Sequence, residues 1–255
     1  MKLKYPAEAF ALGIVLFSAG LKEAFAAGIL VILSAVFAEF LKNLLEPVVP
    51  SWSVKLCVLI GTGSVCASAF LLGFSQLGIE VGTGLWIMTF IVGLFAAKHI
   101  LTAEIDAEYG ELFWESGIAW GFWILLAIAR EFCAGGSIFG NTIFEASFQS
   151  KSFLDTTFGF LVAGLVLAFT NGVLKKRSRD THSLLLVLSM VVFARPFAVE
   201  SFGEIMGMIW TIAVPVVMFL SVKKTLKFAR TGIAYRGLPC EMLAMGFIYM
   251  ILSIY

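Results

Sequence analysis

Runs of hydrophobic residues, separated by short groups of charged and turn-forming residues, follow one another along the whole chain. Nine runs can be delimited, at about residues 8–19, 24–45, 54–77, 83–101, 112–128, 158–174, 184–197, 202–222 and 238–255. A helix needs about 20 residues to cross the hydrocarbon core of a bilayer. The pattern therefore predicts an all-α polytopic membrane protein with about nine transmembrane segments.

Some of the runs are shorter than a membrane crossing. The first and seventh runs, and at the limit the fourth, have the length of broken, tilted or re-entrant elements. The first six runs also divide into two sets of three, residues 7–77 and 83–174. Because each set has three segments, the second set would have the opposite orientation in the membrane. We therefore expect a six-helix domain of two inverted repeats with broken half-helices over residues 1–175, followed by a three-helix extension over residues 176–255.

The composition narrows the class of protein further. Hydrophobic residues make up 60% of the chain and charged residues 14%, and the mean hydropathy is +0.97. A soluble domain carries roughly a quarter charged residues, so the bilayer is the expected solvent for most of this surface. No basic patch interleaved with aromatic residues indicates a nucleic-acid partner, and the N-terminal residues lack a signal-peptide cleavage pattern.

The placement of lysine and arginine residues predicts the orientation of the chain in the membrane, because cytoplasmic loops carry an excess of these residues. The basic groups around residues 175–179 and 223–236 are two crossings apart, so both can be cytoplasmic. With the N-terminus inside, 14 of the 18 lysine and arginine residues fall on the cytoplasmic side. The four that remain are Lys22, Arg130, Lys151 and Arg195. The stretch that begins at Arg130 then starts the outer loop between the fifth and sixth segments.

Residues that could carry chemistry are few. His99 and His182 are the only histidines and have no neighbours at metal-ligand spacing, which favours solvated or capping roles. Cys57, Cys66, Cys133 and Cys240 form no CxxC pair and are interpreted as small apolar residues between helices. Glu39 and Lys42 have the spacing of a helical ion pair near the membrane interface. Arg130 and Glu131, like Arg195, are interpreted as charges that reach the interface from a helix end.

The stretch "REFCAGGSIFG" resembles a motif of integral membrane subunits of the Rnf and Nqr complexes, which couple electron transfer to ion pumping. The likeness is closest to the RnfE/NqrD branch and extends upstream through "ALGIVLF" and "LWIMTFIVGLFAA", so that it covers residues 7 to about 175. The ending "YRGLPCEMLAMGFIYM" resembles the last helix of the RnfA/NqrE branch. The residues that match the motif are Arg130, Glu131, Gly136, Ser137, Phe139 and Gly140.

The sequence departs from this family at the positions that hold its cofactor. In the family, each subunit supplies two cysteines to a [2Fe–2S] cluster shared with a sister subunit. These positions fall on Val15 and Phe90, which cannot ligate iron. The resemblance therefore implies no cofactor in this chain, with flavin or iron–sulfur centres in partner subunits. It also implies a bacterial cytoplasmic (inner) membrane and a hetero-oligomer with sister Rnf/Nqr-type subunits.

Three functions are compatible with these observations. The first is a non-catalytic membrane subunit of an Rnf/Nqr-like redox-driven ion-translocating complex. The second is a secondary transporter or small-solute permease on the same inverted-repeat scaffold, with the half-helices around Gly13 and Gly82–Gly84 lining the path. The third is a membrane assembly factor without a site of its own.

Overall fold

The computed structural model describes residues 3–103, 109–144, 147, 149–176, 183–193, 203–225 and 232–253. In this part of the chain each predicted hydrophobic run coincides with a helix, and two short strands form a hairpin between the fifth and sixth helices. The elements are α1 (Ala7–Phe17), α2 (Leu21–Leu45), α3 (Ser51–Gln76), α4 (Thr83–Thr102), α5 (Tyr109–Gly135), β1 (Ser137–Ile138), β2 (Asn141–Thr142), the 3₁₀ helix η1 (Lys151–Leu154), α6 (Thr156–Leu174), α7 (Ser183–Phe193), α8 (Glu204–Thr225), the 3₁₀ helix η2 (Ile233–Tyr235) and α9 (Leu238–Leu252).

Six of these helices are long and apolar enough to cross a membrane: α2, α3, α4, α5, α6 and α8. The helices α1, α7 and α9 are apolar but shorter, with 11, 11 and 15 residues. The protein is thus an all-α, multi-pass membrane protein. Nine crossings and the inverted repeats remain predictions, because a helix of 11 residues covers only about 16 Å of a roughly 30 Å core.

The fourth segment differs from the broken half-helix that the sequence suggested. Helix α4 runs without interruption from Thr83 to Thr102, and its 20 residues measure about 30 Å. Gly82 precedes the helix and Gly84 lies in its first turn, so these glycines begin the helix and do not break it. Within the described residues, only the first segment of the two proposed sets has the length of a half-helix.

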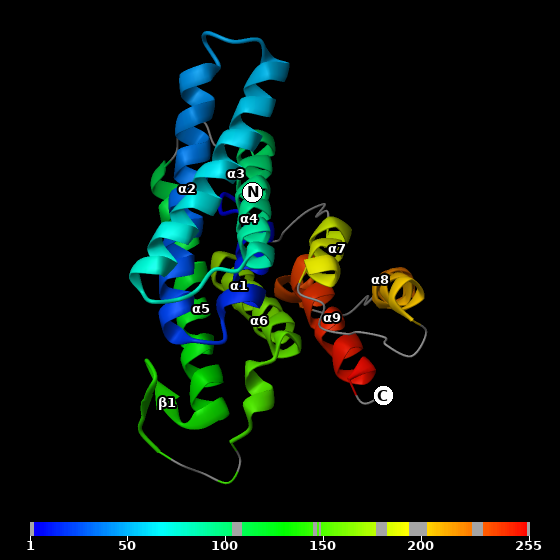
Figure 1. The fold of residues 1–255 in the computed structure, drawn as a ribbon. Coiled ribbons are helices and arrows are strands. Elements are labelled where there is room, and N and C mark those ends of the chain that lie inside the picture. The colour runs from blue at the N-terminus through cyan, green and yellow to red at the C-terminus, as the bar shows by residue number, and fades with distance from the viewer. Residues whose placement is uncertain are drawn as a thin grey trace.

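Helix α1 lies in the middle of the molecule (Figure 1), where α2, α4, α6 and α7 pack against it and the Trp123 ring of α5 contacts Phe10. All of its side chains except those of Glu8 and Leu16 are buried. The approach of neighbouring helices is close at two glycines. A Cβ atom at Gly13 would lie 3.1 Å from the Trp123 ring of α5, and one at Gly159 of α6 would lie 2.6 Å from the Val15 carbonyl oxygen. Small residues thus allow α1 to be enclosed.

The C-terminal helices extend the bundle on one side. Helix α9 packs along α6, α7 lies between α9 and α4, and α8 is the outermost helix (Figure 1). At the ends of these helices, Lys223 of α8 donates to the Ser183 hydroxyl and forms an ion pair with Glu241 of α9 at 2.9 Å. These contacts join the C-terminal end of α8 to the N-terminal ends of α7 and α9.

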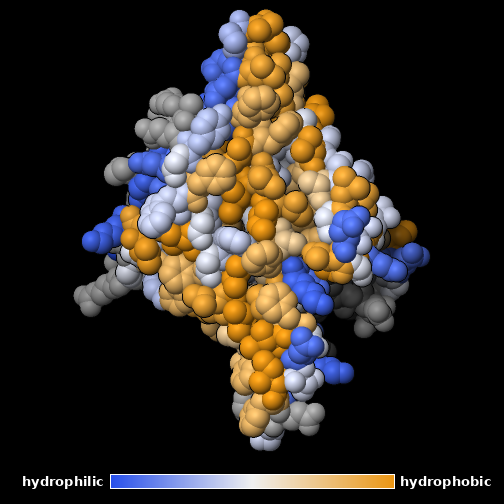
Figure 2. Space-filling model, turned by 90° about the vertical axis from the view of Figure 1, so that its left-hand side faces the viewer, coloured by the Kyte–Doolittle hydropathy of each residue, from blue (hydrophilic) through white to orange (hydrophobic). Residues whose placement is uncertain are grey.

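The surface of the helices is suited to lipid. Figure 2 shows a continuous hydrophobic band along the face that includes α2 and α3. Large apolar side chains of these two helices are exposed, among them Leu33, Leu56, Ile60 and Leu72. Three exposed tryptophans lie near helix starts: Trp52 and Trp86 in the first turns of α3 and α4, and Trp114 in the second turn of α5. This placement is typical of residues at the boundary between bilayer and water.

The two ends of the bundle differ in their polar contacts. At one end, hereafter the lysine end, Glu115 of α5 binds the chain before α1 and pairs with Lys176 beyond α6, and Lys98 of α4 pairs with Glu8 of α1. At the other, the hairpin end, Arg130 and Glu131 of α5 meet the start of α2, the loop before α6 and the β1–β2 hairpin. The orientation pattern predicted one shared side for Lys4, Lys98 and Lys176, and these contacts agree with that grouping.

Candidate functional site

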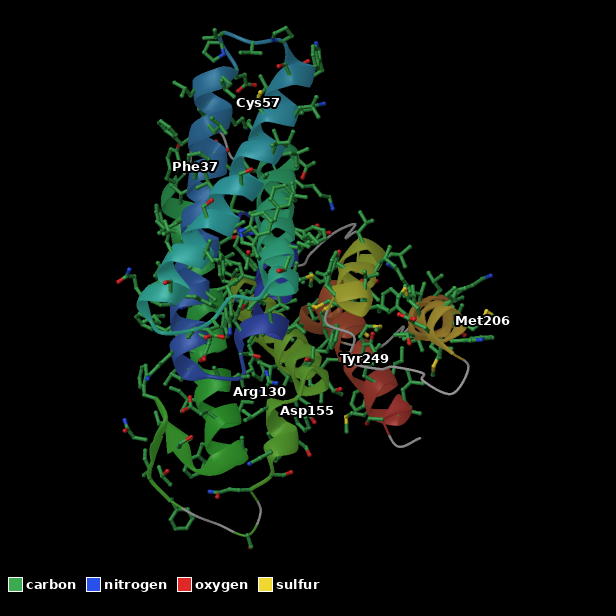
Figure 3. The ribbon with its side chains drawn as sticks, viewed as in Figure 1. Phe37, Cys57, Arg130, Asp155, Met206 and Tyr249 are labelled. Carbon is green, nitrogen blue, oxygen red and sulfur yellow. The ribbon has the colours of Figure 1, made fainter. Side chains whose placement is uncertain are left out.

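Arg130 joins three segments at the hairpin end. Its Nη1 donates to the Ser18 hydroxyl just after α1, at 2.5 Å. Its Nε and Nη2 donate to the backbone carbonyl oxygens of Phe153 and Asp155, immediately before α6, at 2.5 and 2.6 Å. Figure 3 labels Arg130 and Asp155 close together in this region. A guanidinium group has a fixed fork of donors, so it can hold several acceptors in one arrangement.

The neighbouring residue, Glu131, accepts backbone donors from two other segments. Its Oε2 accepts the N–H of Leu21, the first residue of α2, at 2.8 Å. Its Oε1 accepts the N–H of Gly140 in the hairpin at 2.8 Å, and the Ser137 hydroxyl lies 3.5 Å away. The carboxylate therefore satisfies a backbone N–H at a helix start, where no intrahelical partner exists.

At the link between α1 and α2, the two charges match the dipoles of these two helices. The C-terminal end of a helix carries partial negative charge and the N-terminal end partial positive charge. Arg130 lies beside Ser18, which follows the last residue of α1, and Glu131 binds the first residue of α2. The non-helical link between these helices, Ser18–Gly20, is thus stabilised by a cation on the one side and an anion on the other.

The glycines of the motif are required by backbone geometry. Gly136 ends α5 with a φ of 62°, and a Cβ atom there would lie 1.6 Å from the Phe144 carbonyl oxygen. Phe139 and Gly140, with φ values of 55° and 77°, are the two central residues of the hairpin turn between Ile138 and Asn141. Positive φ at both central positions is the geometry of a type I′ turn. The turn points the Gly140 N–H toward Glu131.

These contacts correct the interpretation of Arg130 and Glu131 as charges that snorkel to the interface. Their side chains point into the bundle, and the two residues are only 4% and 8% exposed. Their partners Ser18 and Leu21 are 112 and 110 residues away in the sequence, and Phe153 and Asp155 are 23 and 25 residues away. The sequence stretch gave no signal for these partners.

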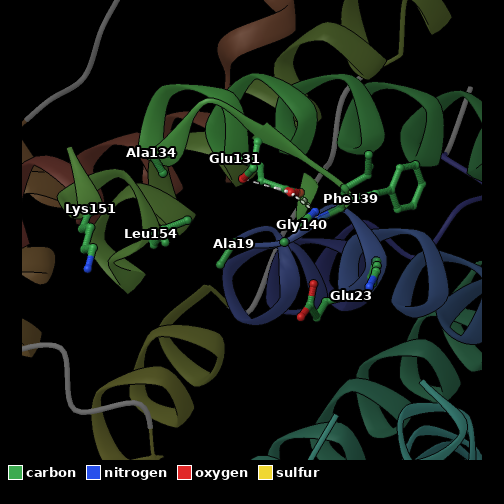
Figure 4. A pocket seen from close by; sticks show the side chains of 13 residues that line it. Ala19, Glu23, Glu131, Ala134, Phe139, Gly140, Lys151 and Leu154 are labelled. Carbon is green, nitrogen blue, oxygen red and sulfur yellow. Dashed lines mark hydrogen bonds between the residues drawn. The ribbon is translucent and has the colours of Figure 1, made fainter. Parts of the chain in front are cut away.

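A cavity of about 490 Å³ opens beside Glu131 (Figure 4). It lies between the start of α2, the end of α5 with the hairpin, and η1. Its lining includes the charged residues Lys22, Glu23, Glu131 and Lys151, together with Leu154 and Phe139. A volume of this size is within the range of small-molecule sites. The charges balance, so the lining does not favour a ligand of one sign.

A second polar cluster, which the sequence reasoning missed, holds the start of α1 at the lysine end. Glu115 is 2% exposed. Its Oε2 accepts the N–H groups of Lys4 and Tyr5 at 2.7 and 3.2 Å, and its Oε1 pairs with Lys176 Nζ at 2.5 Å. The Tyr5 hydroxyl donates to Asn171 Oδ1 at 3.4 Å. Burial, and then the charge of Glu115, raise the pKa of Tyr5, which keeps the phenol protonated.

His99, for which a solvated or capping role was expected, belongs to the same cluster and binds the backbone before α1. Its Nε2 lies 3.0 Å from the Lys4 carbonyl oxygen, so this nitrogen carries a proton. Glu115 and His99 thus bind the backbone of residues 4 and 5, and Lys176 pairs with Glu115. The chain is fixed just before Pro6, which precedes α1.

The two positions that correspond to the family's cluster cysteines have different neighbours. Val15 is buried against the backbone of α6 at Gly159. The Phe90 ring is half-buried and lies against α3, where a Cβ atom at Gly63 would come within 2.8 Å of it. The absence of a cofactor in this chain stays a prediction.

The remaining candidates have structural surroundings. Glu39 is buried and its Oε2 lies 3.8 Å from Lys42 Nζ, which confirms the predicted helical pair. Cys66 is buried, as expected of a small residue between helices, whereas Cys57 is exposed, so that interpretation is wrong for Cys57; all four cysteines are free thiols. His182 and Arg195 lie outside the described residues.

Comparisons with family models, curated proteins and solved structures found no match to this chain.

Proposed function

We propose that this chain is an integral membrane subunit of an Rnf/Nqr-like complex, in which redox reactions drive ion translocation. It would lie in a bacterial cytoplasmic membrane with its N-terminus inside, as the distribution of basic residues predicts. Its partners would be sister subunits of the same type. The chain would serve without a cluster of its own, because the two ligand positions hold Val15 and Phe90.

One observation carries this proposal. Of the residues on which the resemblance rests, Arg130 and Glu131 bind the two sides of the link between α1 and α2. Gly136 and Gly140 shape the hairpin whose N–H also binds Glu131. A motif that resembled the family by chance would not be expected to have a joint task for its charged residues and its glycines. Short helices that end inside a bundle are also the elements around which inverted-repeat membrane proteins build their central sites.

The proposal assigns this chain a structural task in electron transfer. Electrons would pass through flavins or iron–sulfur centres of neighbouring subunits, and this chain would complete the membrane part of the assembly. The enclosed α1 would then be an apolar helix in the place where the family has a cluster-bearing half-helix. Its side chains pack against α5 and α6 at Gly13 and Gly159, as described above.

The test is isolation of the chain from its native membrane with an affinity tag. We expect flavin-linked Rnf- or Nqr-type subunits to copurify in fixed ratio, and their genes to lie beside the gene of this chain. The separated chain should give no [2Fe–2S] signal in electron paramagnetic resonance. A stoichiometric cluster in the chain would disprove the assignment of the ligand positions, and isolation as a homodimer without redox subunits would disprove the proposal.

A secondary transporter is the alternative, favoured by the buried α1 with polar groups at both of its ends. Such ends can present backbone and side-chain groups to a solute. A transporter predicts that some small solute raises the unfolding temperature of the purified chain in a concentration-dependent manner. An Rnf/Nqr-type subunit predicts no such stabilisation by solutes.

A further inference from the structure

The β1–β2 hairpin and the residues that follow it expose a group of large apolar side chains. They are Phe139, Ile143, Phe144 and Leu154, which are 47%, 63%, 56% and 42% exposed. Lys22 and Lys151 are exposed beside them and line the same cavity. We refer to these four apolar residues as the hairpin patch. Exposed apolar groups of this kind usually mark a surface that contacts another molecule or a membrane.

The level of the hairpin patch relative to the bilayer follows from Glu131. This carboxylate binds both the Leu21 N–H and the Gly140 N–H, so the hairpin turn is level with the first residue of α2. Helix α2 has 25 residues, and its ends lie about 18 Å from its midpoint. The hydrocarbon core extends about 15 Å from the bilayer centre and the headgroups to about 20–22 Å. With α2 centred in the bilayer, the hairpin lies among the headgroups.

The positive φ of Phe139 indicates that its side chain has a function. Asparagine, aspartate and glycine are the residues that favour the first central position of a type I′ turn. A bulky residue with positive φ costs on the order of 1 kcal/mol or more, and such strain is retained where the side chain has a task. Phe139 is nevertheless half exposed, so packing within the chain does not compensate for the strain.

The hydrogen bonding of the hairpin is compatible with a region of little water. Strands β1 and β2 pair with each other, the Gly136 carbonyl oxygen accepts the N–H groups of Ile143 and Phe144, and Glu131 accepts that of Gly140. Backbone groups satisfied within the protein can approach the hydrocarbon without a large penalty. Lysines such as Lys22 and Lys151 can reach lipid phosphates while their carbon chains remain in the apolar region.

From these observations we infer that the hairpin patch rests in the bilayer interface, with Phe139, Ile143 and Phe144 inserted between lipid headgroups. The hydrophobic band of the helices supports this, since it continues to the hairpin end of the molecule (Figure 2). The partner of this surface is thus phospholipid and not a second protein. The hairpin then acts as an anchor that fixes the hairpin end of α5 at the membrane surface.

Spin labels measure the position of the patch. The four natural cysteines are replaced, and single cysteines are introduced as Ile143→Cys or Phe144→Cys in the full chain, reconstituted in phospholipid vesicles. Collisions with oxygen, which concentrates in lipid, are compared with collisions with a water-soluble nickel chelate. Leu33→Cys, exposed in the middle of α2, is the lipid control, and Glu46→Cys, exposed after α2, is the water control.

We expect both hairpin labels to meet oxygen more often than nickel, with a ratio closer to that of the Leu33 label than to that of the Glu46 label. A ratio equal to that of the Glu46 label would place the patch in water and overturn the inference. Shielding of both hairpin labels from both reagents would also overturn it, since a protein partner or a second copy would then cover the patch. Monodisperse elution of each labelled variant establishes that it is folded.

Discussion

The Leu21 N–H and the Glu131 carboxylate, 110 residues apart in the chain, are joined by a hydrogen bond of 2.8 Å across the break between α1 and α2. The same carboxylate binds the Gly140 N–H through its other oxygen. A glutamine has one carbonyl oxygen and would turn its amide donors toward one of these N–H groups.

Glu131→Gln therefore leaves one of the two backbone donors, the buried Leu21 N–H or the Gly140 N–H, without an acceptor. We expect the free energy of unfolding to fall by about 2–3 kcal/mol, as for other lost hydrogen bonds to buried charged groups. Chemical unfolding in detergent micelles measures this. Glu111→Gln, at an exposed position on the same helix, is the matched control and should change little. Equal effects of the two substitutions would contradict the role given to Glu131.

Arg130→Lys keeps the charge but not the fork of three donors. A single ammonium group cannot reach Ser18, Phe153 and Asp155 in their present positions, so the variant should lose about 2–4 kcal/mol of stability. Ser18→Ala removes one of the three contacts and should cost about 1 kcal/mol. Because the two residues share a contact, the double variant should lose less than the sum of the single effects. Additive losses would show that the contact does not contribute.

Two adjacent glycines are expected to respond differently to alanine. Gly136→Ala places a Cβ atom 1.6 Å from a backbone carbonyl oxygen and forces an alanine to a φ of 62°, so the cost should exceed about 3 kcal/mol. Gly135→Ala has no atom closer than 3.9 Å and lies in the helix, so its effect should stay within about 1 kcal/mol. Yield of folded protein and unfolding in micelles compare the two. A similar result for both would show that the hairpin adjusts freely.

At the lysine end, the two partners of one ion pair should differ in importance. Lys176→Met removes one partner of Glu115, which retains the Lys4 and Tyr5 N–H groups. Glu115→Leu leaves both N–H groups unpaired and an uncompensated ammonium group on Lys176. The loss for Glu115→Leu should be larger by roughly 2 kcal/mol or more. A larger loss for Lys176→Met, measured by the same unfolding assay, would rule out Glu115 as the anchor.

Hydrophobic pattern alone predicted the positions of the helices, because burial of apolar side chains in lipid or protein depends mainly on local sequence. The prediction fails where contacts with segments distant in the sequence determine the conformation or surroundings of a residue. The run at residues 83–101 looked short, yet α4 is an unbroken helix, since Gly84 in its first turn needs no special conformation. For His99 the sequence predicted a solvated or capping role, but it could not indicate that the backbone at Lys4 lies against the ring.

The charged residues show the same limit. The motif around Arg130 could be recognised, and its glycines could be associated with a tight turn. The acceptors of Arg130 are a hydroxyl and two backbone carbonyl oxygens, and a backbone carbonyl oxygen carries no sequence signal at all. Glu115 could not be singled out for a similar reason, since two of its three partners are backbone N–H groups.

Helix α5 contacts the residues on both sides of α1: Glu115 binds Tyr5 before α1, and Arg130 binds Ser18 after α1. The 15 residues from Glu115 to Arg130 rise about 22 Å, and the 13 residues from Tyr5 to Ser18 about 20 Å when helical. One residue inserted between the two anchors would rotate one relative to the other by about 100° and lengthen the span by about 1.5 Å. The loops around α5 can therefore vary in length. Insertions and deletions between Glu115 and Arg130, in contrast, would separate one of these side chains from its partner.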